Sequence, residues 1–104
     1  MLLNSNLMWK LVGSTTGKTP ITLPQNFNEL SIKLQNGNRE YLFISVPRSQ
    51  LSTEKIDCII GYHLSGGSST YVEYYLSQSE FYIEGALRVG TDTTTTSSAE
   101  IWYK

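Results

Sequence analysis

The chain is poor in the residues that most often build cross-links, metal sites or membrane spans. It contains one cysteine, Cys58, and one histidine, His63. A lone cysteine excludes an intrachain disulfide, so the fold can form in a reducing compartment. No segment approaches the about 20 consecutive apolar residues that a membrane-spanning helix needs, so we expect no membrane insertion. The first eight residues lack a charged start and a long apolar stretch, so we expect no signal peptide.

Charge is also scarce. Charged residues make up 16% of the chain, and the formal net charge is −1. Lysines and arginines are scattered singly and form no basic stripe. Affinity for nucleic acid depends on several contacts between basic side chains and phosphates. A role in nucleic-acid binding is therefore not expected.

What the chain does contain is a polar, aromatic mixture that suits strands and turns. Serine, threonine, asparagine and glycine are frequent, and all of them are poor helix formers. Aromatic residues reach 12%, whereas a disordered chain would have few of them. The length of 104 residues fits one domain with one core. We expect a single domain over residues 1–104, with residues 1–6 as a short extended N-terminal arm.

Apolar and polar residues alternate along most of the chain, which predicts strands with one buried face. The clearest hairpin runs from Leu30 to Val46 around Asn36-Gly37-Asn38, because Asn-Gly tolerates the positive φ of a tight turn. Its core faces are expected to be residues 30, 32 and 34 on one strand and 42, 44 and 46 on the next. A second hairpin is expected between residues 56–64 and 70–76.

The remaining segments complete an antiparallel fold. Further strands are expected at residues 7–12, 80–89 and 99–104, with a bulge or close backbone contact at Gly85. Residues 13–17 are predicted to be a turn, and residues 48–55 an irregular link with room for one helical turn. The segment between Pro20 and Pro24 belongs on a sheet edge or in an extended connection. The predicted fold class is all-β, an antiparallel β-sandwich or jelly-roll-like domain of about seven or eight strands.

Both ends of the chain resemble a known kind of module. The relevant segments are the opening Met8-Trp9-Lys10-Leu11-Val12-Gly13-Ser14-Thr15-Thr16-Gly17, then Ile21-Thr22-Leu23-Pro24 and Phe27-Asn28-Glu29-Leu30, and the ending Ser97-Ser98-Ala99-Glu100-Ile101-Trp102-Tyr103-Lys104. Together they resemble a β-rich module at the C-terminal ends of bacteriophage and prophage tail-fibre and virion surface proteins of Gram-positive gut bacteria. The resemblance implies a structural or adhesive protein of the virion surface, made in the host cytoplasm, and often a homotrimer. It brings no catalytic motif, so no site residue is carried over from it.

Candidate catalytic and metal-binding residues are few and isolated. His63 has no second ligand or catalytic partner nearby in sequence, and it is interpreted as a solvated strand residue. Glu80 and Glu84 lie four residues apart on one strand, too far for a hydrolytic pair, and are interpreted as a wet strand face. Asp92 alone is too little for a calcium loop. Cys58 is interpreted as a small buried hydrophobic residue. We expect no enzyme activity, no metal and no cofactor.

Residues 13–19 also bear a superficial likeness to a phosphate-binding loop. The phosphate loop requires four residues between its two glycines, and only three separate Gly13 from Gly17. Pro20 and Pro24 also block the helix that should follow. This interpretation is rejected.

The aromatic side chains are the most informative candidates for binding. Tyr71 and Tyr75 share one face of a strand, opposite Val72, Tyr74 and Leu76, so at least one tyrosine of this strand should be exposed. Tyrosine provides a large contact area with a polar tip and little loss of entropy. The candidate ligand- or partner-binding residues are Tyr62, Tyr71, Tyr74, Tyr75, Tyr82 and Trp102. The alternative is that these rings pack in the core or between subunits.

The sequence therefore leaves two main hypotheses for function. The first is an adhesive virion module, a tail-fibre tip or a surface-decoration protein, that contacts a cell-surface glycan or another virion protein. The second is a purely structural virion subunit without a host ligand. A third and least favoured hypothesis is an enzyme that acts on polysaccharide. Few charges lie on the expected sheet edges, so a second subunit is expected to cover them.

Overall fold

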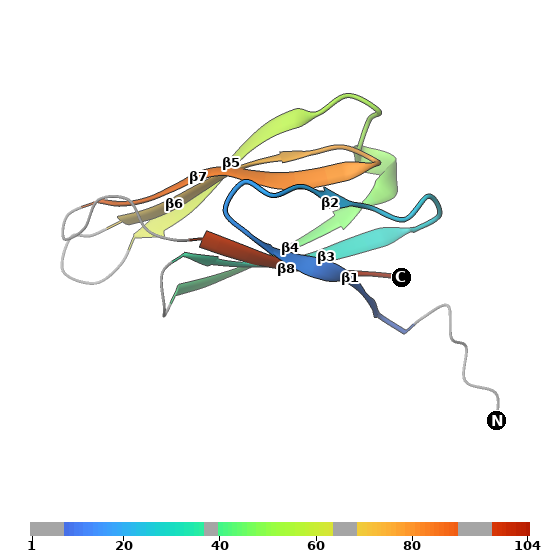
Figure 1. Cartoon of the computed structure of the whole chain (residues 1–104), viewed down its shortest axis with the longest axis horizontal. Helices are drawn as coiled ribbons and strands as arrows, with labels where there is room; N and C mark the ends of the chain where they lie inside the picture. Colours follow the sequence, from blue (N-terminus) through green and yellow to red (C-terminus); the bar gives the residue numbers. More distant parts are fainter. Residues whose placement is uncertain (1–7, 37–39, 64–68, 90–96) are drawn as a thin grey trace.

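In the computed structural model, residues 8–36, 40–63, 69–89 and 97–104 are described, and they form an all-β sandwich (Figure 1). The prediction of an all-β sandwich of antiparallel sheets is confirmed. The strands are β1 (Lys10–Thr16), β2 (Ile21–Thr22), β3 (Glu29–Asn36), β4 (Glu40–Pro47), β5 (Ile56–His63), β6 (Ser69–Leu76), β7 (Glu80–Val89) and β8 (Ser97–Tyr103). One 3-10 turn, η2 (Arg48–Gln50), lies within the link that was expected to hold a helical turn.

The strands form two four-stranded antiparallel sheets that lie one above the other in Figure 1. One sheet has the order β1-β8-β3-β4, and the other has the order β2-β7-β6-β5. Both predicted hairpins are present, as β3–β4 and β5–β6. Their predicted turns fall largely on residues 37–39 and 64–68, which lie outside the described part of the chain. Between the sheets, β1 contacts β2, β8 contacts β7, and β3 contacts β6, so the edges of the sandwich are β1 and β2 on one side and β4 and β5 on the other.

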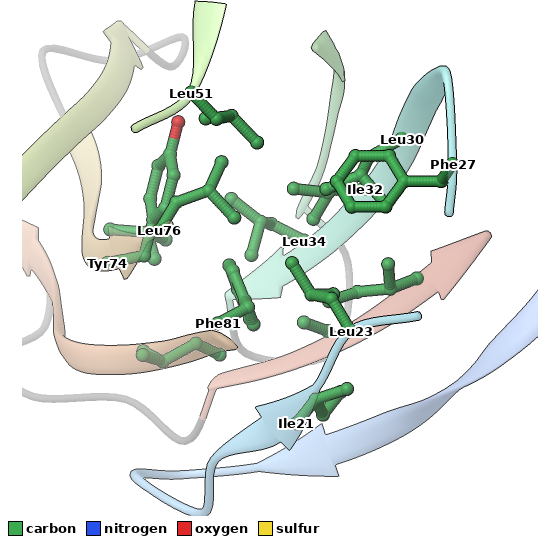
Figure 2. Close-up of a cluster of buried hydrophobic side chains, with 14 residues drawn as sticks. Ile21, Leu23, Phe27, Leu30, Ile32, Leu34, Leu51, Tyr74, Leu76 and Phe81 are labelled. Atoms are coloured by element: carbon green, nitrogen blue, oxygen red, sulfur yellow. The ribbon is translucent and has the colours of Figure 1, made fainter. Parts of the chain in front are cut away.

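The core lies between the sheets and follows the predicted alternation. Leu30, Ile32 and Leu34 of β3 are fully buried, as are Phe81 and Ile83 of β7. Figure 2 shows side chains from both sheets, with Phe81 and Leu34 among them, pointing toward one another. The inward residues of edge strand β4, at positions 42, 44 and 46, are only partly buried but pack against this cluster. Burying large apolar side chains is the main stabilising contribution of such a fold, about 1.5–3 kcal/mol for each one.

The segment from Gly13 to Gly17 corrects the sequence prediction, because β1 continues through most of it. The pairing of β1 with β8 shifts between Leu11 and Gly13, which marks a bulge at Val12. The bulge lets Val12 and Thr15 both face the core, although three positions separate them. The chain then turns at Gly17, whose φ of 67° favours glycine and whose N–H donates to Ser97 O at 3.0 Å. The strand continues because β8 offers backbone partners as far as Thr16.

Two local predictions are confirmed by the strand register. The β6–β7 pairing shifts after Glu73, which is opposite Gly85, so that Glu84 is the extra residue of a bulge in β7. A Cβ at Gly85 would meet nothing within 4 Å, so the glycine marks the bulge and not a close approach. The two-residue β2, next to Pro20, pairs only with β7 at the sheet edge, as the prolines predict.

Candidate functional site

Three tyrosines gather on the outer side of the β2-β7-β6-β5 sheet, and this surface is called the tyrosine face. Tyr71 and Tyr75 belong to β6, and Tyr82 belongs to the neighbouring β7. They point outward because the alternate positions of β6 fill the core: Val72, Tyr74 and Leu76 are 0%, 7% and 2% exposed. The register places Tyr75 directly between Tyr82 on β7 and Asp57 on β5. The two-residue alternation of the strand thus builds the face.

The rings of the tyrosine face are ordered by contacts with one another and with a lysine. Tyr75 and Tyr82 are stacked, with ring centroids 5.0 Å apart and an angle of 24° between their planes. The Nζ atom of Lys55 lies 5.1 Å from the centre of the Tyr82 ring. Tyr71 is 40% exposed at the other end of the same face. Such stacking fixes ring positions and reduces the entropy lost when a ligand binds.

Carboxylates lie around these rings, and two of the carboxylates form ion pairs with lysines. The Lys55 Nζ atom lies 3.1 Å from Glu80 Oε1, and the Lys18 Nζ atom lies 3.2 Å from Glu84 Oε1. The hydrogen bond and charge of Glu80 raise the pKa of Lys55. The wet-face interpretation of Glu80 and Glu84 agrees with their half-exposed, lysine-paired positions. Surface ion pairs of this kind add little stability, but they hold both long side chains in place.

Asp57 and Glu73 form a second acidic pair on this face. Asp57 is exposed on β5, and Glu73 is half-exposed on β6, where it lies opposite Ile59, two residues from the Asp57–Tyr75 pair. A hydrogen bond with Asp57 is the main cause that raises the pKa of Glu73, with burial and the Asp57 charge adding to it. The charge of Asp57 also raises the pKa of the Tyr75 hydroxyl. A protonated Glu73 donates to the Asp57 carboxylate, and on deprotonation the two groups repel each other.

This acidic pair predicts a pH dependence of stability. Because the folded-state pKa of Glu73 is raised, the folded chain binds this proton more tightly than the unfolded chain does. The resulting stabilisation is complete below the ordinary glutamate pKa of 4.5 and is lost as pH rises through the raised value. In the Glu73→Gln variant the amide side chain does not titrate, and its N–H group can still donate a hydrogen bond to Asp57. We expect urea midpoints from pH 4 to pH 7 to fall less for Glu73→Gln than for the wild type.

The control for that measurement is Glu54→Gln. Glu54 is an exposed glutamate of the link between β4 and β5, and its hydrogen bonds with Ser52 use its backbone atoms. Its substitution should leave the pH profile of the wild type unchanged. Parallel profiles for wild type and Glu73→Gln would show that the Asp57–Glu73 pair does not affect stability.

The opposite sheet carries different aromatic residues on its outer side. Trp102 of β8 is half-exposed, and its Nε1–H donates to Glu100 Oε1 at 2.9 Å. The Nζ atom of Lys33 lies 4.8 Å from the centre of the Tyr41 ring. A shallow hollow of about 240 Å³ on this sheet is lined by Ser14, Thr15, Thr16, Lys33, Gln35, Ser98, Ala99 and Glu100. No aromatic ring lines this hollow, so it offers a ligand little apolar contact.

The structure separates the candidate binding residues into groups. Tyr71, Tyr75 and Tyr82 lie together on the tyrosine face, and Trp102 lies on the other sheet. Tyr74 differs from the contact-residue prediction: it is buried beside Phe81, with ring centroids 5.7 Å apart. Burial raises the pKa of Tyr74 to about 12, since an ionised hydroxyl there would lose water. The side chain of Tyr62 lies outside the described part of the structure.

Of the charged residues of this site, the sequence patterns singled out only Glu80 and Glu84. Asp57 and Glu73 stand singly in their strands and belong to no motif. The side chain of His63 is not among those described. Lys18 and Lys55 come from two connections that carry no periodic pattern. The available signal was the β5–β6 hairpin, but the register that places Asp57 opposite Tyr75 depends on the length of its turn.

Among the described residues, no group of three or more histidine, cysteine, aspartate or glutamate side chains could hold a metal ion. Cys58 is half-buried on β5, and burial raises the pKa of its thiol. No helix in the described ranges is long and apolar enough to cross a membrane.

The fold therefore defines a two-sheet, all-β sandwich protein with one exposed, acidic, tyrosine-bearing face. No protein-family model, no curated protein and no solved structure matches the chain. Its functional assignment consequently depends on the geometry and charge of that face.

Proposed function

We propose that the chain is an adhesive module of a phage virion surface, and that its tyrosine face binds a cell-surface glycan. The single observation that carries the binding role is the gathering of Tyr71, Tyr75 and Tyr82 with carboxylates on one exposed sheet face. The virion context is supported by the resemblance of both chain ends to tail-fibre modules. The proposed mechanism is binding without catalysis.

The chemistry of the tyrosine face suits sugars. A pyranose ring has a face of C–H groups that packs on an aromatic ring, and a rim of hydroxyls that donate hydrogen bonds. Tyr71 offers exposed ring surface, and Tyr75 with Tyr82 offers a pre-ordered ring pair. The neighbouring Asp57, Glu73 and Glu84 accept hydrogen bonds from hydroxyls, and charged acceptors form the stronger bonds.

The charge of this face selects among glycans. Four acidic groups, Asp57, Glu73, Glu80 and Glu84, are accompanied by two lysines, Lys18 and Lys55, and each lysine already pairs with a glutamate. An added phosphate or carboxylate would meet net negative charge. We therefore expect neutral or amino-sugar glycans as ligands, and no binding of phosphate-bearing polymers. Repeated copies on a virion would strengthen weak single sites by avidity.

The test is a glycan array followed by calorimetry with the sugar that binds best. Tyr75→Ala removes one ring of the stacked pair, and we expect it to weaken binding about tenfold or more, as for a central contact residue. The matched control is Trp9→Ala. The Trp9 ring is 38% exposed, has the Lys104 ammonium group over it, and lies away from the tyrosine face. An array without any neutral or amino-sugar ligand, or equal losses in the two variants, would contradict the proposal.

A second candidate function is a structural virion subunit that binds only other proteins. The observation that favours it is the exposed apolar surface of the edge strands, where Phe43 is 72% and Ile59 is 70% exposed. Exposed apolar patches on a protein surface often mark contacts with other proteins. A silent glycan array together with retained self-association would support this second candidate.

A further inference from the structure

The two long sides of the sandwich differ in how they protect their strand edges. On the β1–β2 side, β1 carries a bulge at Val12 and an exposed Lys10, and β2 is two residues long beside Pro20. Bulges, lysines, prolines and very short strands all discourage pairing with another chain. The strand edges on this side are therefore protected against pairing with another chain.

The β4–β5 side lacks these protective features within the described residues. β4 and β5 are each eight residues long and pair with their neighbours without a register shift. Neither strand contains a lysine, and the single proline, Pro47, is the last residue of β4. β4 and β5 are both terminal strands of their sheets, so among the described strands each has a partner on one side only. This side is called the open edge.

Apolar side chains line the open edge on both faces of β4. Outward, Tyr41 is 44% and Phe43 is 72% exposed. Inward, residues 42, 44 and 46 are only partly buried, in contrast to the fully buried residues of β3. On β5, Ile59 adds an outward side chain that is 70% exposed. An exposed, apolar strand edge of this length is a template for a further strand.

We propose that the open edge is the interface with a second copy of this chain, in which the two β4 strands pair antiparallel about Phe43. Antiparallel pairing of a strand with itself has twofold symmetry, so one surface serves both partners. In this register Phe43 is opposite its own copy, and residue 42 is opposite residue 44. The inward and outward positions of the two strands then coincide, and each sheet face continues across the dimer.

Charge and area favour a second copy as the occupant. The one charged residue of β4, Glu40, would be opposite Val46 of the copy, so no like charges meet along the pair of β4 strands. The eight residues give an edge about 26 Å long, and two layers about 10 Å apart with their outer side chains give a thickness of about 20 Å. Two such sides bury about 1,000 Å² in total, the lower limit for a specific interface. A reversible dimer is therefore expected, in contrast to the trimer that the fibre resemblance implies.

Sedimentation velocity from one to several hundred micromolar tests this proposal. The wild type should show a concentration-dependent monomer–dimer equilibrium. Phe43→Lys, a substitution at an exposed position, should raise the dimer dissociation constant about tenfold or more. The matched control is Leu11→Lys, which places the same charge on β1, where Leu11 is 53% exposed. A wild-type chain that stays monomeric or forms trimers, or equal effects of the two substitutions, would overturn the proposal.

A cross-link tests the register directly. In a Cys58→Ala background, Phe43→Cys would place two thiols opposite each other, with Cβ atoms about 5 Å apart. Mild oxidation should convert this variant to a covalent dimer much faster than it converts Leu11→Cys in the same background. Equal cross-linking of the two variants would exclude the β4 pairing. This inference does not depend on the glycan proposal, because the open edge and the tyrosine face use different residues.

Discussion

Phe81→Ala is expected to destabilise the fold by about 3–5 kcal/mol, which is the usual cost of removing a large buried aromatic side chain. Phe81 is fully buried at the start of β7 and packs beside Tyr74 of β6, with ring centroids 5.7 Å apart. Its removal forfeits the transfer free energy of the ring and leaves a cavity between rigid strands that cannot close around it. The whole free energy of unfolding of a natural domain is about 5–15 kcal/mol. The variant should therefore lie near the limit of folding, which urea denaturation at low protein concentration would measure.

The matched control is Phe43→Ala, since Phe43 is the same residue type at an exposed position of β4. Its substitution should change the free energy of unfolding by about 0.5 kcal/mol or less, if the measurement is made below the concentration at which the chain associates. Equal losses for the two phenylalanines would show that the core is not centred on β3 and β7 as described.

Ser77→Ala is expected to cost about 1–3 kcal/mol, a large effect for the loss of one oxygen atom. Ser77 is 1% exposed at the start of the turn between β6 and β7. Its Oγ accepts hydrogen bonds from the backbone N–H groups of Ser79 at 3.2 Å and Glu80 at 3.1 Å. Alanine would leave both donors without this partner in a crowded turn. For a domain of about 100 residues, thermal melting should move down by about 4–8 °C for each kcal/mol lost.

Ser79→Ala is the control for this turn. Ser79 is exposed, and its side chain contributes only a contact with the Ser77 hydroxyl at 3.3 Å, whereas its backbone bonds persist in the variant. Its melting temperature should stay close to that of the wild type. A Ser77→Ala melting curve that overlies the wild type would show that backbone hydrogen bonds, such as the one from Ser77 N–H to Glu80 O at 2.9 Å, hold the turn without the Ser77 hydroxyl.

Alternation alone predicted the parts of the fold where one face of a strand is buried. The buried residues of β3 and the opposed faces of β6 follow directly from the two-residue period. Where a bulge breaks that period, the prediction was wrong: residues 13–17 were assigned to a turn because Gly, Ser and Thr are turn formers, and most of them belong to β1. The pairing with β8, a segment more than eighty residues away, outweighs that local preference. A tertiary partner of this kind leaves no local mark in the sequence.

The candidate site was predictable only in part for the same reason. Tyr71 and Tyr75 were placed on one face by their spacing, and the structure confirms that they are on the opposite face from buried Tyr74. The contribution of Tyr82 and of Asp57 depends on which strands become neighbours. The roles of Lys18 and Lys55 depend on how two irregular connections cross between the sheets. Sequence spacing does not determine which strands become neighbours, so it could not predict side chains that only the topology brings together.

The position of β8 has a consequence for how the domain is made. β8 lies between β1 and β3, so the sheet has no contiguous form until residues 97–103 have been inserted. During synthesis β1 leaves the ribosome well before β8, its one neighbour among the described strands, whereas β3 and β4, and likewise β5, β6 and β7, are neighbours both in the chain and in their sheet. Closing such distant pairs is entropically slow. The nascent chain thus completes its sandwich only after its last strand has left the ribosome, and release of a chain cut short before residue 97 would leave β1 unpaired.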